Sequence, residues 1–363
     1  MSPKPRSIAI WVGTRPEYIK MAPLVLELKK DDRFLVHFIH SGQHESLGKG
    51  TGKLFGIRPV ELSLPPTHGR LELLEQELQK QASTWFREHS VDCVLVQGDT
   101  ATAYCVAQVA HSLGITIGHV EAGLRTYDLA QPFPEEGYRQ AITKWSTWHY
   151  SPSEQATSNL VGEGIDSTKI HQVGNTIVDA FESLKQQIYS STSLDLPTPY
   201  WVMTLHRRES QGEPAKHVIE ALKSHLSMHP SQHLVVIRHP NPKTHPPLDE
   251  LKDHPQVKLL DALEYLPFLT LCAHSDGILS DSGGLQEEAS LLGLPIVVFR
   301  EVTERPEVME AGYGKLVGTD TEKIHIGLNW MQTLEKPLNK CSFYGDGASS
   351  KAIHAHLVDV LLP

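Results

Sequence analysis

Residues Val91–Glu121, V-D-C-V-L-V-Q-G-D-T-A-T-A-Y-C-V-A-Q-V-A-H-S-L-G-I-T-I-G-H-V-E, determine the fold class of this 363-residue chain. The short apolar runs at Val91–Gln97 and Ile115–Glu121 are typical of buried parallel strands. Between them, Thr100–Leu113 has the length and composition of a helix. A strand, a helix and a second strand in this order predict a parallel sheet with helices on its faces, and therefore an α/β protein.

The same alternation extends in both directions from this unit. Around it we expect strands at Ser7–Val12, Phe34–His40, Trp148–Ser151 and Ile170–Val173, and helices at Pro16–Lys30, Arg70–His89, Tyr138–Trp145 and Ile177–Tyr189. A linker-like stretch, S-S-T-S-L-D-L-P-T-P at residues 190–199, precedes a second set. That set has strands at Tyr200–Leu205, His233–Arg238, Val257–Leu260, Gly277–Ser280 and Pro295–Arg300, and helices at Pro214–Met228, Tyr265–Ala273, Gly284–Leu292 and Ser349–Leu362. The pattern predicts two doubly wound domains with a cleft between them; one large α/β domain is the alternative.

Length and composition limit the class of protein. A chain of 363 residues exceeds one ordinary core, and 40% hydrophobic with 21% charged residues is ordinary for a globular enzyme. The formal net charge of −10 argues against nucleic-acid binding, and no apolar run approaches the ~20 residues that span a bilayer. The amino terminus M-S-P-K-P-R has no signal-peptide pattern, and the four cysteines are scattered. We therefore expect a cytoplasmic protein without nucleic-acid or membrane partners.

Three carboxylates stand at or near the ends of predicted elements. Asp99 and Glu121 follow the two strands of the central unit, and Glu135 lies in the turn-rich P-F-P-E-E. The carboxyl ends of strands in open α/β sheets face the ligand, and a carboxylate placed there can be tuned for proton transfer near neutral pH. The structural alternative is that Glu121 pairs with Arg125. Glu135 would pair likewise with Arg139. The convergence of three carboxylates favours catalysis.

Two glycine-containing turns are typical of anion sites. In G-T-R-P-E, a strand ends at Gly13 and a helix follows, which offers backbone N–H groups and the Arg15 guanidinium to an anion. Such turns are common in α/β proteins. The stretch S-D-S-G-G-L-Q-E-E is more specific, because Ser282 and two glycines precede a helix, where a phosphate oxygen can bind. Glu288 inside that helix suits a ribose diol; an ordinary solvated residue is the alternative.

Basic residues follow two further strands. His206, Arg207 and Arg208 come directly after one strand, and R-H-P-N-P ends the next. This combination suits a diphosphate whose charge grows as it leaves, and T-E-R-P-E closes the same edge, although a lone His206 would more often be structural. The 21 histidines form no H-E-x-x-H motif, so we expect no metal site. No G-x-G-x-x-G follows the first strand, so NAD is not indicated.

Several motifs together carry a family resemblance. In chain order they are G-T-R-P-E-Y-I-K-M-A-P-L, S-G-Q-H, Q-G-D-T, H-V-E-A-G-L-R-T, P-F-P-E-E, V-G-N-T-I-V-D-A, H-R-R-E-S, E-Y-L-P-F, D-S-G-G-L-Q-E-E, T-E-R-P-E and Y-G-D-G. From about Ile8 to Gly347 the chain closely resembles the bacterial UDP-N-acetylglucosamine 2-epimerases of the non-hydrolysing type.

The resemblance implies a GT-B-like fold of two Rossmann-type domains. Residues 1–178 would form the sugar-facing domain, residues 179–347 the UDP-binding domain, and residues 348–363 a terminal helix that packs back on the first domain. It also implies a homodimer that needs no cofactor and serves polysaccharide biosynthesis. The implied reaction is reversible inversion at C2, through elimination of UDP to a 2-acetamidoglucal intermediate and re-addition from the other face.

Matched position by position, the resemblance also implies roles for individual residues. Asp99, Glu121 and Glu135 match the family's acid/base carboxylates, and His206 matches the histidine beside the leaving diphosphate. The implied substrate-binding residues are Arg15, Lys20, Arg125, Arg139, Arg207, His239, Asn241, Ser282, Gly283, Gly284, Glu288 and Arg305.

Two departures from the family pattern are visible. The family's Q-H-x-x-M-L-D, part of a pocket for a second, activating substrate molecule, is replaced here by Q-H-E-S-L-G-K-G-T-G-K-L-F. Gln43 and His44 remain as allosteric candidates, but Ser46 and the added glycines weaken the expected site. Leu205 stands where the family has a glycine before the catalytic histidine.

Other functions stay open on the sequence alone. A hydrolysing 2-epimerase would use the same residues and release N-acetylmannosamine and UDP. A relative acting on a diacetamido-uronic acid nucleotide would carry an extra arginine pocket. A glycosyltransferase on the same fold would leave the three carboxylates without a purpose, and a non-catalytic sensor would not need them.

Overall fold

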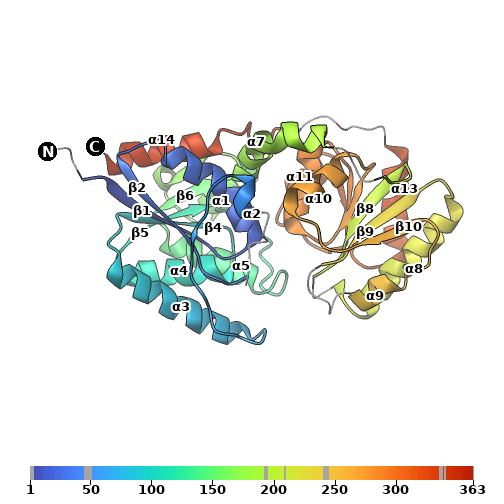
Figure 1. Ribbon diagram of the computed structural model, residues 1–363, viewed down its shortest axis with the longest axis horizontal. Helices are drawn as coiled ribbons and strands as arrows, with labels where there is room; N and C mark the ends of the chain where they lie inside the picture. Colours follow the sequence, from blue (N-terminus) through green and yellow to red (C-terminus); the bar gives the residue numbers. More distant parts are fainter. Residues whose placement is uncertain are drawn as a thin grey trace. The chain divides into compact units, whose positions relative to one another are not determined.

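The computed structural model describes residues 4–44, 51–191, 195–207, 210–239, 245–334, 338 and 341–362. The contacts of the chain divide it into two compact units (Figure 1). The amino-terminal unit comprises Met1–Ser183 and Ser342–Pro363, and the carboxyl-terminal unit comprises Leu184–Cys341. This division falls inside helix α7 (Thr176–Ser190), as does the boundary predicted after residue 178.

The amino-terminal unit is built on a seven-stranded sheet in the order β3-β2-β1-β4-β5-β6-β7. All its neighbouring strands run parallel. The order reverses at β1, which pairs with β2 on one side and β4 on the other, and ligands of open α/β sheets bind beyond the carboxyl ends of the strands at such a switch point. The strands are β1 (Arg6–Val12), β2 (Phe34–His40), β3 (Val60–Glu61), β4 (Cys93–Gln97), β5 (Thr116–Val120), β6 (Trp148–Ser151) and β7 (Ile170–Gln172).

Helices cover both faces of this sheet. On one face α3 packs against α4 and α4 against α5, and on the other α1 packs against α14 (Figure 1). Trp11, Val96 and Ile117 belong to the buried cluster beneath α3, α4 and α5. The helices are α1 (Arg15–Leu28), α2 (Thr51–Leu54), α3 (Leu71–Glu88), α4 (Ala101–Ser112), α5 (Glu135–Trp145), α6 (Glu154–Gly162), a short 3₁₀ turn (Ser167–Lys169), α7 and α14 (Ser349–Leu361).

The carboxyl-terminal unit repeats this architecture with six parallel strands in the order β10-β9-β8-β11-β12-β13. Its order reverses at β8, between β9 and β11. Trp201, Met203 and Leu222 lie in its buried core. Its strands are β8 (Tyr200–Thr204), β9 (His233–Ile237), β10 (Val257–Leu260), β11 (Ile278–Ser280), β12 (Ile296–Val298) and β13 (Gly314–Leu316), and its helices are α8 (Glu213–Met228), α9 (His245–Asp249), α10 (Tyr265–Ala273), α11 (Gly283–Leu292), α12 (Pro306–Glu310) and α13 (Thr321–Thr333).

The predicted α/β class and the doubly wound arrangement of each sheet are confirmed. The helix predicted over Tyr138–Trp145 is part of α5, which begins earlier, at Glu135, so the end of P-F-P-E-E is the first turn of a helix. Acidic residues are favourable there because they face the positive end of the helix dipole. The predicted cleft between the domains stays a prediction. Among the described residues, no helix has the length and apolar character that crossing a membrane requires.

Candidate active site

The first candidate site lies in the amino-terminal unit, at the switch point between β1 and β4. Gly13 follows β1, Asp99 follows β4 after Gly98, and Glu121 follows β5. A Cβ atom on Gly13 would lie 2.0 Å from Oγ1 of Thr102 in α4. The end of β1 therefore packs directly against the first turn of α4, and only glycine fits there.

Glu121 forms a buried ion pair with Lys20. The Lys20 ammonium donates to Oε2 of Glu121, and the two side chains are only 6% and 7% exposed. Asn175 donates a second hydrogen bond to the same oxygen at 3.2 Å. The backbone of Glu121 has a φ of +65°, a left-handed conformation that non-glycine residues seldom adopt. A buried charge persists only with such partners. Lys20 and Asn175 therefore stabilise the Glu121 carboxylate at the end of β5.

Arg139 connects two acidic residues. Its guanidinium pairs with Asp99 and, at 3.1 Å, with Glu136. Glu136 is fully buried and also accepts the backbone N–H groups of Thr126 at 3.0 Å and Tyr127 at 3.2 Å. Arg139 therefore forms an ion pair with Asp99. Glu136 fixes the loop after β5 through its two backbone hydrogen bonds. Glu136 was not predicted as a site residue, although its position in P-F-P-E-E places it beside the partly exposed Glu135.

Arg125 pairs with a carboxylate other than the predicted catalytic ones. Its Nε and Nη2 atoms lie 2.6 and 2.9 Å from the two oxygens of Glu163. Nη2 also donates to Thr143, and Nη1 donates to the carbonyl of Leu124. The guanidinium is thus paired with Glu163, so the structural alternative of an Arg125–Glu121 pair is wrong. Its predicted contact with substrate stays a prediction.

Glu17 is a buried carboxyl that the sequence analysis did not select. Its Oε2 accepts N–H groups of Gly13 and Thr14 at 2.9 and 2.8 Å, and its Oε1 accepts the hydroxyl of Thr100 at 2.7 Å. Burial raises the pKa of Glu17 to about 7, although these hydrogen bonds lower it. The spacing T-R-P-E is a capping box, which could have revealed this residue. Glu17 ties the start of α1 to the start of α4, next to Asp99.

The allosteric candidates Gln43 and His44 bond to the start of α4 and to the turn before α1, respectively. Oε1 of Gln43 accepts the backbone N–H and the hydroxyl of Thr102 at 2.9 and 2.8 Å. The exposed His44 donates its backbone N–H to the carbonyl of Gly13 at 2.9 Å. Ser46, on which the predicted weakening of a second ligand site rests, lies outside the described residues.

A second candidate site lies in the carboxyl-terminal unit, at the switch point between β8 and β11. Nδ1 of His206 lies 3.0 Å from Oδ1 of Asp281, and Oδ2 accepts the backbone N–H groups of His206 and Arg207 at 2.9 and 2.7 Å. Burial would raise the pKa of Asp281, but these partners outweigh it and lower the pKa to about 2. The ring of His206 stacks on that of His239, with centroids 5.1 Å apart. Asp281 was missed as a site residue, yet it fixes the orientation of the predicted His206.

The start of α11 is suited to an anion. The hydroxyl of its N-cap residue, Ser282, makes no capping hydrogen bond, and the first N–H groups of a helix lack partners within the helix. A Cβ on Gly283 would lie 2.7 Å from Glu304, whereas a Cβ on Gly284 would meet nothing within 4 Å. The space before Gly284 is therefore open, and the partly exposed Glu288 follows it on α11.

Arg305 lies in a buried ion-pair network. Its Nε lies 2.6 Å from Glu287 and its Nη1 donates to Glu304. Arg300 pairs with Glu304 at 2.9 Å, and burial lowers the pKa of Arg300. This network packs against Gly283 at the start of α11. Asn241, also predicted to bind substrate, lies outside the described residues. No cluster of metal-ligating side chains occurs within the part of the chain that the structure describes.

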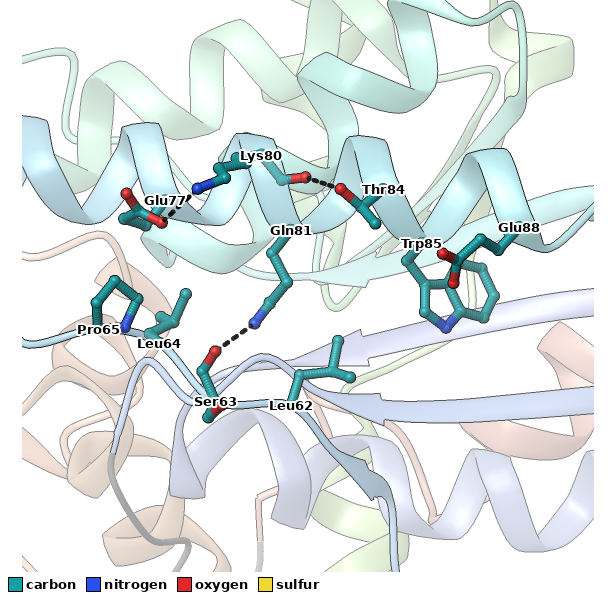
Figure 2. A pocket seen from close by; sticks show the side chains of 10 residues that line it. All are labelled: Leu62, Ser63, Leu64, Pro65, Glu77, Lys80, Gln81, Thr84, Trp85 and Glu88. Carbon is teal, nitrogen blue, oxygen red and sulfur yellow. Dashed lines mark hydrogen bonds and ion pairs between the residues drawn. The ribbon is translucent and has the colours of Figure 1, made fainter.

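Figure 2 shows a separate pocket of about 280 Å³ between α3 and residues 62–65. Trp85 and Leu62 form part of its wall, and Gln81 donates to the carbonyls of Ser63 at 3.3 Å and Ser41 at 3.0 Å. None of the predicted catalytic or binding residues lines it.

Comparisons with known proteins identify the family of the chain. Residues 26–358 match the family model described as UDP-N-acetylglucosamine 2-epimerase. The chain is 36% identical to the UDP-N-acetylglucosamine 2-epimerase of Neisseria meningitidis serogroup A, over 94% of this chain and 96% of the relative. It is 38% identical to that of Escherichia coli O157:H7, over 94% and 95% of the two chains. The crystal structure of the Neisseria meningitidis enzyme bound to UDP-GlcNAc is similar with a TM-score of 0.89 and 35% identity, over 98% of this chain and 100% of the other.

Proposed function

The chain belongs to the UDP-N-acetylglucosamine 2-epimerase family, and we propose that it interconverts UDP-N-acetylglucosamine and UDP-N-acetylmannosamine by inverting C2. The observation that carries this proposal is the pair of carboxylates at the carboxyl ends of β4 and β5. Asp99 is held by Arg139 and Glu121 by Lys20. Carboxylates held in this way beside a switch point suit proton transfer at a bound sugar.

The proposed chemistry is elimination followed by addition. A carboxylate removes the proton from C2, the bond between C1 and the UDP oxygen breaks, and a 2-acetamidoglucal forms. UDP then adds back to C1 while a proton is delivered to the opposite face of C2. Asp99, Glu121 and Glu135 share these proton transfers. Loss of UDP is needed because the C2 proton is too weakly acidic for direct removal to be fast.

The carboxyl-terminal unit is proposed to stabilise the departing UDP. The backbone N–H groups in the first turn of α11 and the hydroxyl of Ser282 would bind phosphate oxygens, as helix amino termini do. Asp281, whose low pKa keeps it ionised, lies 3.0 Å from Nδ1 of His206 and orients the ring. His206, oriented in this way, would then lie beside the diphosphate on which charge grows as it leaves.

The test is anomeric-proton NMR of UDP-N-acetylglucosamine incubated with the full chain in heavy water. We expect the anomeric signal of UDP-N-acetylmannosamine, with deuterium at C2 of the product and, with time, of the recovered substrate. Release of N-acetylmannosamine and UDP would instead identify the hydrolysing reaction. An unchanged spectrum would contradict the proposal, and epimerisation without exchange would contradict proton transfer through solvent-exchanging carboxylates.

A further inference from the structure

The turn between β4 and Asp99 is held to β5 through both backbone groups of one residue, Gly98. Nε2 of His119 lies 2.8 Å from the carbonyl oxygen of Gly98, and the His119 side chain is fully buried. The N–H of Gly98 donates to the carbonyl of Val120 at 3.0 Å. Gly98 directly precedes Asp99, and Val120 directly precedes Glu121. The two hydrogen bonds therefore join the chain segments that carry the two carboxylates.

The hydrogen-bond pattern fixes the tautomer of His119. Burial lowers the pKa of His119 to about 3, so the ring is neutral at neutral pH. Since the Gly98 partner is a carbonyl, which only accepts, Nε2 must carry the hydrogen and Nδ1 must be unprotonated. Nδ1 is buried and bonds to no described residue. An unsatisfied buried acceptor costs free energy of folding, and an apolar side chain would avoid this cost. The interaction that a histidine supplies at this position is therefore its hydrogen bond to Gly98.

The turn that His119 holds lies against Glu121. Gly98 has a φ of +64°, and a Cβ on it would lie 3.5 Å from Oε1 of Glu121. A shift of Gly98 would therefore change the separation of Asp99 and Glu121. Displacements of about 1 Å in a catalytic group can reduce turnover by roughly 10²-fold.

We propose that His119 is a positioning residue for this reaction: its Nε2–H bond to Gly98 sets the position of Asp99 relative to Glu121. This inference rests on the proposed function for its effect on turnover, but not for its effect on the structure of the turn.

His149 provides a matched control. It pairs in register with His119 on the neighbouring strand β6, so both rings lie on the same face of the sheet. It is 1% exposed, and burial lowers its pKa to about 4. Its ring bonds to no residue that the structure describes. Replacing it changes the packing of the same layer without removing a bond to Gly98.

The experiment compares His119→Phe, His119→Gln, His119→Asn and His149→Phe in the full chain. Glutamine places an N–H donor where Nε2 lies, whereas the shorter asparagine does not reach it. We expect kcat to fall about 10²-fold in His119→Phe with KM changed less than about threefold. His119→Gln should recover most of this loss, His119→Asn should not, and His149→Phe should remain near wild type. Equal kcat in His119→Phe and His149→Phe, or in His119→Gln and His119→Asn, would overturn the proposal.

Amide hydrogen exchange gives a readout that does not depend on activity. The peptide covering residues 97–101 should exchange at least about tenfold faster in His119→Asn than in wild type, and unchanged in His149→Phe. Unchanged exchange in His119→Asn would overturn the positioning role, whatever reaction the protein catalyses. A wild-type protein without epimerase activity but with this exchange pattern would contradict the proposed function and leave the positioning of Asp99 supported.

Discussion

At the scale of single residues, the proposed chemistry depends on three carboxylates. Replacing Asp99, Glu121 or Glu135 with its amide preserves size but removes proton transfer. We expect kcat to fall by about 10²–10⁴ with little change in the affinity for UDP. Single-turnover kinetics and UDP calorimetry measure the two effects. The exposed Glu72→Gln serves as the control, and near-native turnover in any of the three variants would assign that residue a structural role.

Glu17 should make stability depend on pH. Its pKa is raised from 4.5 to about 7 because it is buried, so the folded protein binds this proton more tightly than the unfolded chain does. The free energy of unfolding therefore falls as pH rises between about 4.5 and 7 and levels off above, by up to roughly 3 kcal/mol. Glu17→Gln removes this contribution. Urea denaturation from pH 5 to 8 should show the variant gaining stability relative to wild type. Parallel curves for the two proteins would contradict the expectation.

At the scale of elements, the start of α11 offers a paired test of anion binding. Gly284→Ala should be tolerated, because its Cβ meets no atom within 4 Å, and alanine stabilises a helix over glycine by about 0.5–1 kcal/mol. The methyl group would nevertheless occupy the open space where phosphate is expected. We predict a UDP Kd raised at least about tenfold with an unchanged or higher Tm.

Gly283→Ala is the matched comparison for this helix terminus. Its Cβ would lie 2.7 Å from Glu304 and 2.8 Å from Arg305, so it should disturb the buried ion-pair network and lower the Tm. Thermal unfolding and UDP calorimetry on both variants separate the two effects. Wild-type UDP affinity in Gly284→Ala would show that phosphate does not bind at the start of α11.

The elements also show what a sequence can and cannot reveal. Strands β2, β6 and β10 and helix α10 have the predicted bounds, since each is an uninterrupted apolar or amphipathic run. The sequence pattern does not predict α6, β13 or α13. In α6 only Ala156 and Leu160 are buried, so the apolar periodicity that identifies a helix is too weak. The three strand-end positions of Asp99, Glu121 and His206 were predictable from local pattern.

The partners of these residues were not predictable, because they are distant in sequence. Lys20 reaches Glu121 from α1, and Asp281 reaches His206 from the position directly after β11. Sheet order brings these strand ends together, and no local pattern of residues contains that order. The family resemblance did point to Lys20, whereas Asp281 became visible only through its burial and hydrogen bonds.

At the scale of the whole molecule, both units use the same arrangement at their switch points. In each, a buried carboxylate at the end of one strand is held by a basic side chain from another element: Glu121 with Lys20, and Asp281 with His206. In the first unit the carboxylate would act on the sugar. In the second it would orient a group that stabilises phosphate. The net charge of −10 is therefore compatible with an anionic substrate, because the cations stand at the sites themselves.

Regulation by a second substrate molecule should be weak in this protein. Oε1 of Gln43, an allosteric candidate, already accepts two hydrogen bonds from Thr102. A ligand that needed this oxygen would leave a backbone N–H unsatisfied, at a cost of about 1–3 kcal/mol, which corresponds to roughly a tenfold loss of affinity. We expect near-hyperbolic kinetics and turnover of UDP-N-acetylmannosamine without added UDP-N-acetylglucosamine, measured as initial rates in both directions. A Hill coefficient near two that falls to one in Gln43→Ala would show instead that Gln43 exchanges Thr102 for a second ligand.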